Sequence, residues 1–498
     1  MSTSTSLTSL LSDLASSSSS SIDLSSILEA AMGASTEGID VTSAVNASVQ
    51  AAEQPEVVWE DQVSTLESQS SALSAIETDV NNVESDLQSL NSLTGPLSST
   101  TVSSSDSSLV TATAATGTAS GQTSVVVNSL ATTATAVSST LASSSTALPA
   151  GETVTINGTA FTISSGETLS TLQTDINAAG LGVKASIITD ASGVMLSLAS
   201  STSGSNGSFT VSTTGDTGSA FSFAAVTPSG ESGSSDNSGG ITASGSDASL
   251  TVNGIAINSA TNTVTNAVSG LTINLLNASP GTSTTLTVAP NTSEVSTAVN
   301  QFVSDYNTLI TALNAQFSDT SSSSSGSTSG QGVLAQDPIV NNLQSDLLQA
   351  IDYTASPASG SSSTSVPNLS SLGITMNSDG TLSVDSTTLS NVLENNFSDV
   401  RNFFQGGSQN GFADTLNQTL TGFTSSSDGS FTVDLSSIST EESGFETDIT
   451  NFQTNVITPL KTQLNTEYSD AEEALQELPR EMQGINELLG INTSSSGG

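Results

Sequence analysis

Residues 59–90 read WEDQVSTLESQSSALSAIETDVNNVESDLQSL, and this stretch decides the fold class of the N-terminal part of the chain. One row of residues at heptad spacing consists of Trp59, Leu66, Leu73, Val80 and Leu87. A second row, offset from the first, consists of Gln62, Gln69, Ile76, Val83 and Leu90. Alternating steps of three and four residues place both rows on one face of an α-helix. The stretch therefore predicts a coiled coil or bundle helix that ends at Gly95-Pro96. An amphipathic helix packed inside its own domain fits the same pattern.

A second apolar stripe with helical spacing lies near the C-terminus, between residues 445 and 489. Pro459 and Pro479 lack a backbone N–H, so we expect this helix to be kinked or split. The candidate helix-association residues of the two stripes are Trp59, Leu66, Leu73, Ile76, Val80, Val83, Leu87, Leu90, Leu464, Tyr468, Leu475, Leu478, Met482, Ile485 and Leu489. The two stripes can pack on each other within one chain or on copies of the chain, and the sequence leaves both alternatives open.

The middle of the chain, from about residue 100 to 290, has the pattern of β-structure. Short alternating or apolar runs are separated by Gly, Asn, Asp and Ser, and Asn157-Gly158 and Asn253-Gly254 are strong hairpin signals. One helix interrupts the strands at 168–179, with a Thr cap at its start and Gly180 at its end. The low-complexity stretches 229–240 and 318–332 are predicted to be loops or linkers.

Helical spacing returns at 295–313, and further helices are predicted at 339–350, 386–395 and 412–420. Two acidic turns lie nearby, Asp379-Gly380 with Asp385, and Asp428-Gly429 with Asp434. Neither has the spacing of a calcium-binding loop, so hairpin turns are favoured over a metal site at both places.

The predicted fold class is a multidomain α+β protein, in which terminal coiled-coil-like helices and a helical-bundle domain enclose two inserted β-rich domains. The predicted division has a flexible Ser-rich arm at 1–37 and a helical segment at 38–96. The first β domain is expected at 97–136 and 236–290, and the second, inserted β domain at 137–235. A helical domain with hairpins at 291–438 and a C-terminal helical segment at 439–498 complete the chain.

The composition excludes several classes of function. The chain has no Cys and no His, and its net charge is −43 because 47 acidic residues face only four basic ones. The basic residues are Lys184, Arg401, Lys461 and Arg480. Four cations are too few to neutralise a useful number of phosphates, which excludes nucleic acid and makes an anionic membrane a poor partner. Arg401 is a candidate for pairing with a carboxylate at an interface, with an ordinary solvated pair as the alternative.

Catalysis is not expected. Without Cys and His there is no thiolate nucleophile, no Ser-His-Asp triad and no zinc site of the usual kind. A carboxylate-only glycosidase remains conceivable, but its cleft would need aromatic side chains, which make up only 4% of the chain. We therefore predict no enzyme and no cofactor. No apolar run reaches the ~20 residues of a membrane span, and the first 35 residues lack a signal-peptide pattern. These features predict no membrane insertion, and, if the protein leaves the cell, export by a route other than general secretion.

Several segments resemble, in order, the family of bacterial flagellar filament cap proteins, also called hook-associated protein 2. The most specific is LSSLGITMNSDGTLSVDSTTLSNVLENNFSDVRNFF at 369–404. The others are GIDV at 38–41 before the heptad helix, 93–113 with 121–131, 154–200, and 271–288 with 299–313. The chain departs from the family in its Ser-rich start, its scarcity of Lys, and Pro479 with Gly484 in the last helix.

The resemblance implies a protein that is exported unfolded through the flagellar type III channel without a cleaved signal peptide and acts outside the cell at the filament tip. There it would assemble with itself into a ring, commonly a pentamer, with terminal helices touching the filament and β domains forming a plate. The implied partners are flagellin, the hook–filament junction proteins and, before export, a chaperone; some relatives are linked to adhesion. The alternatives are another axial flagellar protein, such as a junction protein or flagellin, and a surface adhesin.

Overall fold

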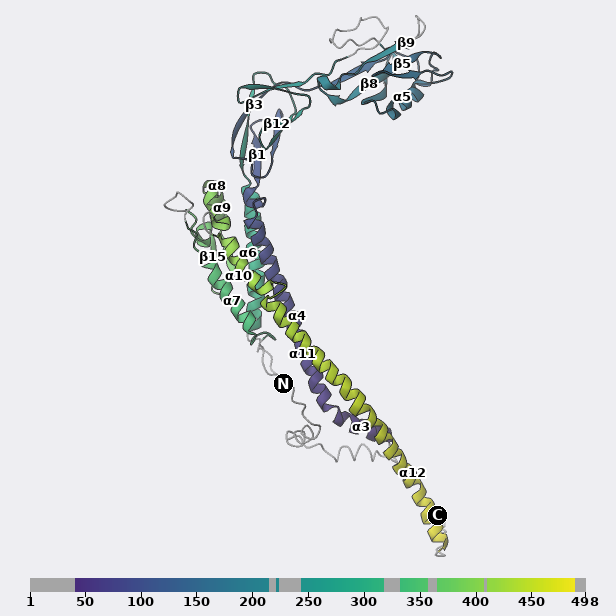
Figure 1. Ribbon diagram of the computed structural model, residues 1–498, viewed down its shortest axis with the longest axis vertical. Coiled ribbons are helices and arrows are strands. Elements are labelled where there is room, and N and C mark those ends of the chain that lie inside the picture. Colours follow the sequence, from purple (N-terminus) through teal and green to yellow (C-terminus); the bar gives the residue numbers. More distant parts are fainter. Residues whose placement is uncertain are drawn as a thin grey trace, which may run out of the picture.

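The computed structural model describes residues 41–214, 221–223, 243–317, 332–356, 365–406 and 410–488. The predicted arm at 1–37, the stretch 229–240 and most of 318–332 lie outside these residues. The described chain is long and curved: a column of helices carries one β-rich part at its end and a second one beyond it (Figure 1). The predicted fold class is confirmed, because helices at both ends of the chain enclose two groups of strands.

The heptad stretch forms α4 (Gln54–Asn91), preceded by α3 (Val41–Ala52). Pro55 lies in the first turn of α4, where its missing N–H breaks no helical hydrogen bond. The helix ends as Ser92 turns to extended backbone. A Cβ on Gly95 would lie 2.1 Å from the Ser89 carbonyl oxygen, so only glycine lets the chain turn this closely past the helix end. The predicted end of the helix is confirmed.

Further helices pack around α4 to form what we call the helical core. They are α6 (Thr292–Phe317), α7 (Pro338–Ile351), α8 (Ser386–Asn395), α9 (Phe397–Gln405), α10 (Phe412–Thr424) and α11 (Ser430–Phe452). Helices α6, α10 and α11 lie directly against α4. The rings of Phe403 and Phe412 stack at the centre, with centroids 5.3 Å apart. Apolar residues from distant parts of the sequence therefore share one core.

A hairpin of β15 (Ile374–Met376) and β16 (Leu382–Val384) packs against this core. Asp379-Gly380 forms its turn, as predicted, and the Asp379 carboxylate accepts hydrogen bonds from the N–H and hydroxyl of Thr381. Asp385 caps the following helix α8. The prediction of a hairpin at Asp428-Gly429 is wrong, because these residues join helices α10 and α11. The Phe431 ring packs near Phe423, and this burial overrides the alternating pattern that suggested a strand.

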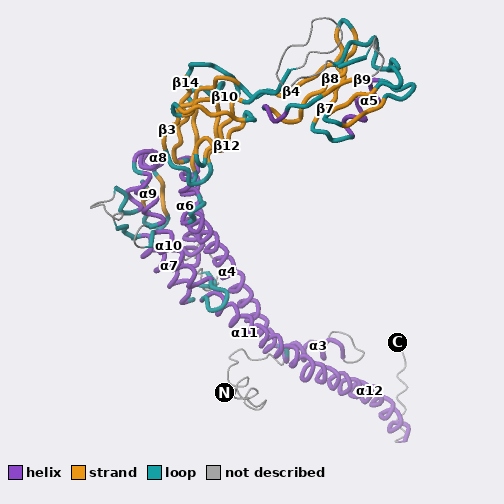
Figure 2. The backbone as a smooth tube through the Cα atoms, turned by 45° about the horizontal axis from the view of Figure 1, so that its top comes forward, coloured by secondary structure: helices purple, strands orange, loops and turns teal. Residues whose placement is uncertain are grey.

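The first β domain consists of two sheets that continue upward from α4 and α6 (Figures 1 and 2). One sheet has the order β1-β14-β3-β10-β11 and the other β12-β13-β2. The strands are β1 (Thr100–Ser104), β2 (Val110–Ala114), β3 (Gly121–Ser129), β10 (Ala248–Val252), β11 (Ile255–Ser259), β12 (Thr263–Val268), β13 (Leu271–Leu275) and β14 (Ser283–Pro290). Asn253 and Gly254 both have positive φ, which confirms the predicted tight hairpin between β10 and β11.

The second β domain contains the sheets β4-β8-β7 and β6-β5-β9 and the helix α5 (Leu169–Ala178). Its strands are β4 (Thr133–Val137), β5 (Thr153–Ile156), β6 (Thr159–Thr162), β7 (Val183–Asp190), β8 (Gly193–Ser203) and β9 (Val211–Thr214). The predicted hairpin at Asn157-Gly158 and the predicted Thr cap, Thr168, are both confirmed. Most of strand β4 lies within the range predicted for the first β domain, 97–136. It nevertheless pairs with β8 of the second β domain. The domain boundaries as a whole stay predictions.

The C-terminal stripe forms α11, then one π-helical turn at Gln453–Ile457, then α12 (Thr458–Leu488). Pro459, which lacks a backbone donor, lies two residues after this turn, so the irregular hydrogen bonding occurs next to the proline. Pro479 does not end the helix, because α12 continues to Leu488. The helix is therefore not split at either proline, and the kink expected at these positions stays a prediction.

Candidate functional site

The middle of α4 is buried in the helical core of its own chain. Its predicted association residues there are nearly or completely inaccessible to solvent: Leu66, Leu73, Ile76, Val80, Val83, Leu87 and Leu90. They belong to the same cluster as the apolar residues of α6, α10 and α11. The structure thus realises the packing of an amphipathic helix inside its own domain. Whether this face also contacts another chain stays a prediction.

The N-terminal and C-terminal helical segments meet below the helical core. Trp59 is half-buried, and its ring lies edge-on to Phe452 of α11 with centroids 5.5 Å apart. Helix α3 folds against the start of α12, where Leu464 and Tyr468 pack beside a small buried cluster. The cluster consists of Val45, Val49 and Ile457. The terminal helices therefore pair within one chain at this level.

Beyond Tyr468, α12 runs past α3 as a single helix (Figures 1 and 2). Ile485 lies in this part, and its side chain is 56% exposed. Leu475, Leu478 and Met482 also lie in α12, but their side chains are outside the described part, and Leu489 is outside it altogether. An apolar residue on a helix that extends beyond its neighbours is a candidate contact for another chain.

Some acidic side chains inside the helical core contact hydroxyls or other carboxyl groups, and no ion pair with them occurs among the described residues. The buried Glu84 carboxylate accepts hydrogen bonds from the hydroxyls of Thr421 and Thr424 on α10, each at 2.9 Å. Burial, followed by a hydrogen bond to Asp305 on α6 and the charge of Asp305, raises the pKa of Asp86 to about 7. A proton on Asp86 removes the charge repulsion between Asp86 and Asp305, and with it one source of repulsion between α4 and α6.

A similar carboxyl pair joins α11 to α7. Burial raises the pKa of Asp434, with a further contribution from the charge of Asp337 and a hydrogen bond to it. Asp337 also caps α7 by accepting a hydrogen bond from the Ile339 N–H. The described residues contain no group of three or more acids placed to hold a metal ion. Hydroxyl groups surround Glu84, and the raised pKa values of Asp86 and Asp434 favour their uncharged forms.

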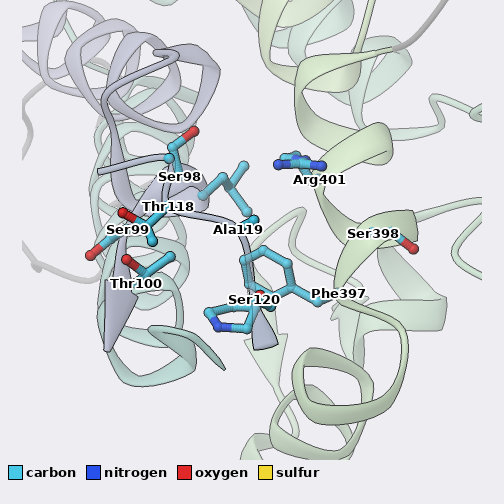
Figure 3. A pocket seen from close by; sticks show the side chains of 12 residues that line it. Ser98, Ser99, Thr100, Thr118, Ala119, Ser120, Phe397, Ser398 and Arg401 are labelled. Atoms are coloured by element: carbon cyan, nitrogen blue, oxygen red, sulfur yellow. The ribbon is translucent and has the colours of Figure 1, made fainter. Parts of the chain in front are cut away.

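A cavity of about 350 Å³ lies where the helical core meets the first β domain. The first β domain contributes hydroxyl-bearing residues near 98–100 and 117–120, and α9 contributes Phe397, Ser398 and Arg401 (Figure 3). Arg401 was noted in the sequence as one of four cations, but only the fold brings it beside residues almost 300 positions away. Within the described residues it makes no ion pair and no hydrogen bond.

None of the described helices combines the length and the apolar character that spanning a membrane requires.

Two family models of known proteins match successive parts of this chain. Residues 37–134 match the family model "Flagellar hook-associated protein 2 N-terminus", and residues 245–482 match "Flagellar hook-associated protein 2 C-terminus". The two models together cover more than half of the chain. The unmatched residues between them contain most of the second β domain.

Among curated relatives, the B-type flagellar hook-associated protein 2 of Pseudomonas aeruginosa is 29% identical over 167 residues, or 32% of this chain and 33% of its own length. Flagellar hook-associated protein 2 of Salmonella typhimurium is 28% identical over 173 residues, or 34% of this chain and 35% of its own. The matches thus span about a third of these relatives. A solved structure of domains D1–D2–D3 of the flagellar cap protein FliD from Escherichia coli is 27% identical, with a TM-score of 0.53. That match covers 74% of this chain and 99% of the solved one.

Proposed function

The chain belongs to the flagellar hook-associated protein 2 family, and we propose that it is the structural cap at the distal tip of the bacterial flagellar filament. In this role it promotes flagellin polymerisation and prevents the loss of exported flagellin. One observation carries the proposal: both halves of the family match this chain in order, and its fold follows that of a solved flagellar cap protein. The family is structural, so the chain is not an enzyme. The family match also favours the cap over a junction protein, a flagellin or an adhesin.

The geometry supports different roles for the two ends of the molecule. The single-helix part of α12 lies at one end and the two β domains lie at the other, with the helical core between them (Figure 1). In the proposed function, α12 and its apolar residues contact the growing filament, and the β domains form the plate above it. An exposed helix suits contacts that are made and released as subunits are added, because it has no deep interface to break.

The proposal includes partners and location. The chain assembles with itself into a ring, a pentamer as is common in the family, and contacts flagellin and the hook–filament junction proteins. Before export it binds a chaperone, and it reaches the extracellular tip without a cleaved signal peptide. Oligomerisation and association with other flagellar components agree with the family match, and the subunit number and each named partner are part of the proposal.

The test is immunogold labelling of intact growing filaments with an antibody against residues 137–235, combined with measurement of flagellin in the medium. We expect label only at the free tip, and loss of monomeric flagellin into the medium when the protein is removed. A chain truncated after Tyr468 is the matched variant, because it keeps the helical core and both β domains but lacks the single-helix part of α12. We expect it to fold and to fail in capping.

Label at the filament base would assign the chain to the junction proteins, and label along the filament would assign it to flagellin. Either result overturns the proposed function. Full capping by the truncated chain would overturn the role given to α12 and leave the cap itself standing.

A further inference from the structure

The cavity beside Arg401 contains hydrogen-bond donors that the chain does not use. The guanidinium of Arg401 is exposed and makes no ion pair or hydrogen bond within the described residues. The hydroxyls of Ser98, Ser120 and Ser398 make no hydrogen bond there either. Figure 3 shows Arg401 on the α9 side of the cavity and Ser98 on the opposite side, whereas the Ser398 hydroxyl points away from the cavity. A guanidinium on one wall and a serine hydroxyl on the other, neither with a hydrogen-bond partner among the described residues, can together bind an anion.

The other hydroxyls of the cavity are already committed to the fold. Ser99 donates to the Glu294 carboxylate at 2.5 Å, and Thr118 donates to the carbonyl oxygen of Ala115 at 2.6 Å. These bonds fix the β-domain wall. The half-buried ring of Phe397 forms part of the opposite wall. The cavity is therefore held open by bonds around it, and the free donors need not break any of them to bind a ligand.

The charge of the chain indicates what the anion is. Only four cations face 47 acidic residues, and Arg401 is the single cation between residues 185 and 460, the range that contains most of the helical core. Two copies with a net charge of −43 repel each other when they meet. Association therefore needs places where a carboxylate of one copy meets a positive charge of the other. The planar fork of an arginine binds a carboxylate through two parallel hydrogen bonds.

We propose that this cavity accepts an Asp or Glu side chain from a second copy of the chain, with Arg401 as its anchor and the free hydroxyl of Ser98 as a supporting donor. The inference rests on the proposed function, since it needs copies that assemble side by side. Among the described residues, no carboxylate of the same chain pairs with Arg401. A neighbouring copy supplies the same carboxylates at the high local concentration of an assembled ring.

The position of the cavity gives the contact a second consequence. The helical core and the first β domain are connected twice, from α4 to β1 through Leu97, Ser98 and Ser99, and from β14 to α6 just after Pro290. Residues at both connections line the cavity. A side chain bound between these connections and α9 fixes the angle between the two parts. Assembly and the orientation of the β domains are thereby coupled.

The first test measures association of the full chain by light scattering over a range of concentrations. Arg401→Gln should weaken association at least about tenfold, because a charged, bidentate hydrogen-bonded contact is lost. Arg401→Lys keeps the positive charge but loses the two parallel N–H donors of the guanidinium. Its association should be weaker than that of the original chain and stronger than that of Arg401→Gln. Lys184→Gln is the matched control: it removes one positive charge from an exposed site on β7, away from the cavity, and should leave association within twofold of the original. Circular dichroism checks that each variant is folded.

The second test identifies the bound side chain. Because the chain has no Cys, Ser398→Cys places a unique thiol at the cavity for a photoactivated cross-linker. Copies with and without a heavy isotope are mixed before irradiation. We expect cross-linked peptides that join labelled to unlabelled copies and carry an Asp or Glu near the linked position.

Equal weakening by Arg401→Gln and Lys184→Gln would assign the effect to net charge and overturn the inference. Cross-links confined to one copy, or formed only with flagellin, would also overturn it. If the original chain assembles and labels the tip while Arg401→Gln assembles equally well, only this inference fails. A chain that never assembles and never labels the tip contradicts the proposed function itself.

Discussion

Two helices with the same kind of sequence pattern have different surroundings in this fold. Helix α4 carries an apolar stripe whose residues from Leu66 to Leu90 are buried among α6, α10 and α11. Helix α12 also carries a stripe, but beyond Tyr468 it runs past α3, its neighbour among the described helices, and Ile485 is exposed. Periodicity therefore tells which face of a helix is apolar, but the presence of a partner in the same chain decides whether that face is already covered. We expect the α4 stripe to govern folding and the α12 stripe to govern assembly.

The largest expected effect comes from putting the same charge into each stripe. Leu73→Asp leaves an unpaired carboxylate in the fully buried row of α4, and we expect it to lower the free energy of unfolding by about 5 kcal/mol. Ile485→Asp places the carboxylate on an exposed site, and the free energy of unfolding should change by less than about 0.5 kcal/mol. Chemical denaturation followed by circular dichroism measures both. Similar losses in the two variants would show that α12 is as firmly packed as α4.

The second comparison concerns a glutamate on each helix. Glu84 on α4 is buried and bonded by two threonine hydroxyls, so Glu84→Ala should cost about 2 kcal/mol of stability. Glu467 on α12 is exposed and accepts a hydrogen bond from Gln463 one turn away. Glu467→Ala should cost at most about 0.5 kcal/mol. Glu84→Gln keeps one acceptor oxygen and should recover part of the loss. A Glu84→Ala variant as stable as the original would mean that the bridge to α10 contributes nothing.

The third comparison uses pH. Burial, and then the neighbouring Asp305, raise the pKa of Asp86 from 3.8 to about 7 in the folded chain. The folded state therefore holds a proton that the unfolded state releases. This contribution to stability is complete below pH 3.8 and is lost as the pH rises through about 7. Partial exposure screens the repulsion, so we expect the loss to be about 1 kcal/mol.

Asp86→Asn mimics the protonated side chain and should flatten the pH dependence of the unfolding midpoint between pH 4 and 8, the range set by the raised pKa. Asp470→Asn, at an exposed site on α12, is the control. An Asp86→Asn variant whose midpoint still falls with pH like that of the original chain would show that another group carries the effect.

The sequence predicts those parts of the fold that are determined locally. Helix α8 has the bounds predicted from periodicity, and the hairpins at Asn157-Gly158 and Asn253-Gly254 form because both residues of each pair adopt positive φ. The Thr168 cap is equally local, since its hydrogen bonds reach only to Thr171. In each case the residues that encode the feature also form it.

Features that depend on distant residues were not predictable in this way. The start of α11 resembles a strand in sequence, and it becomes a helix because Phe431 is buried beside Phe423. The cavity beside Arg401 combines α9 with residues 97–100 and 117–120, which no spacing along the chain connects. The sequence does not identify the partner of the α4 stripe for the same reason, because periodicity marks an apolar face without showing which residues cover it.

The smallest expected effect distinguishes a buried tyrosine from an accessible one. Tyr306 on α6 is fully buried in the helical core, and its hydroxyl oxygen has no hydrogen-bond partner within the described residues. A buried hydroxyl that has lost its water without gaining a partner costs free energy. Tyr306→Phe should therefore raise the free energy of unfolding by up to about 1 kcal/mol, whereas Tyr468→Phe, on the half-exposed part of α12, should leave it unchanged. Thermal denaturation of the two variants measures the difference. If Tyr306→Phe is destabilising, the hydroxyl has a partner, and the core around α6 is more polar than that around α4.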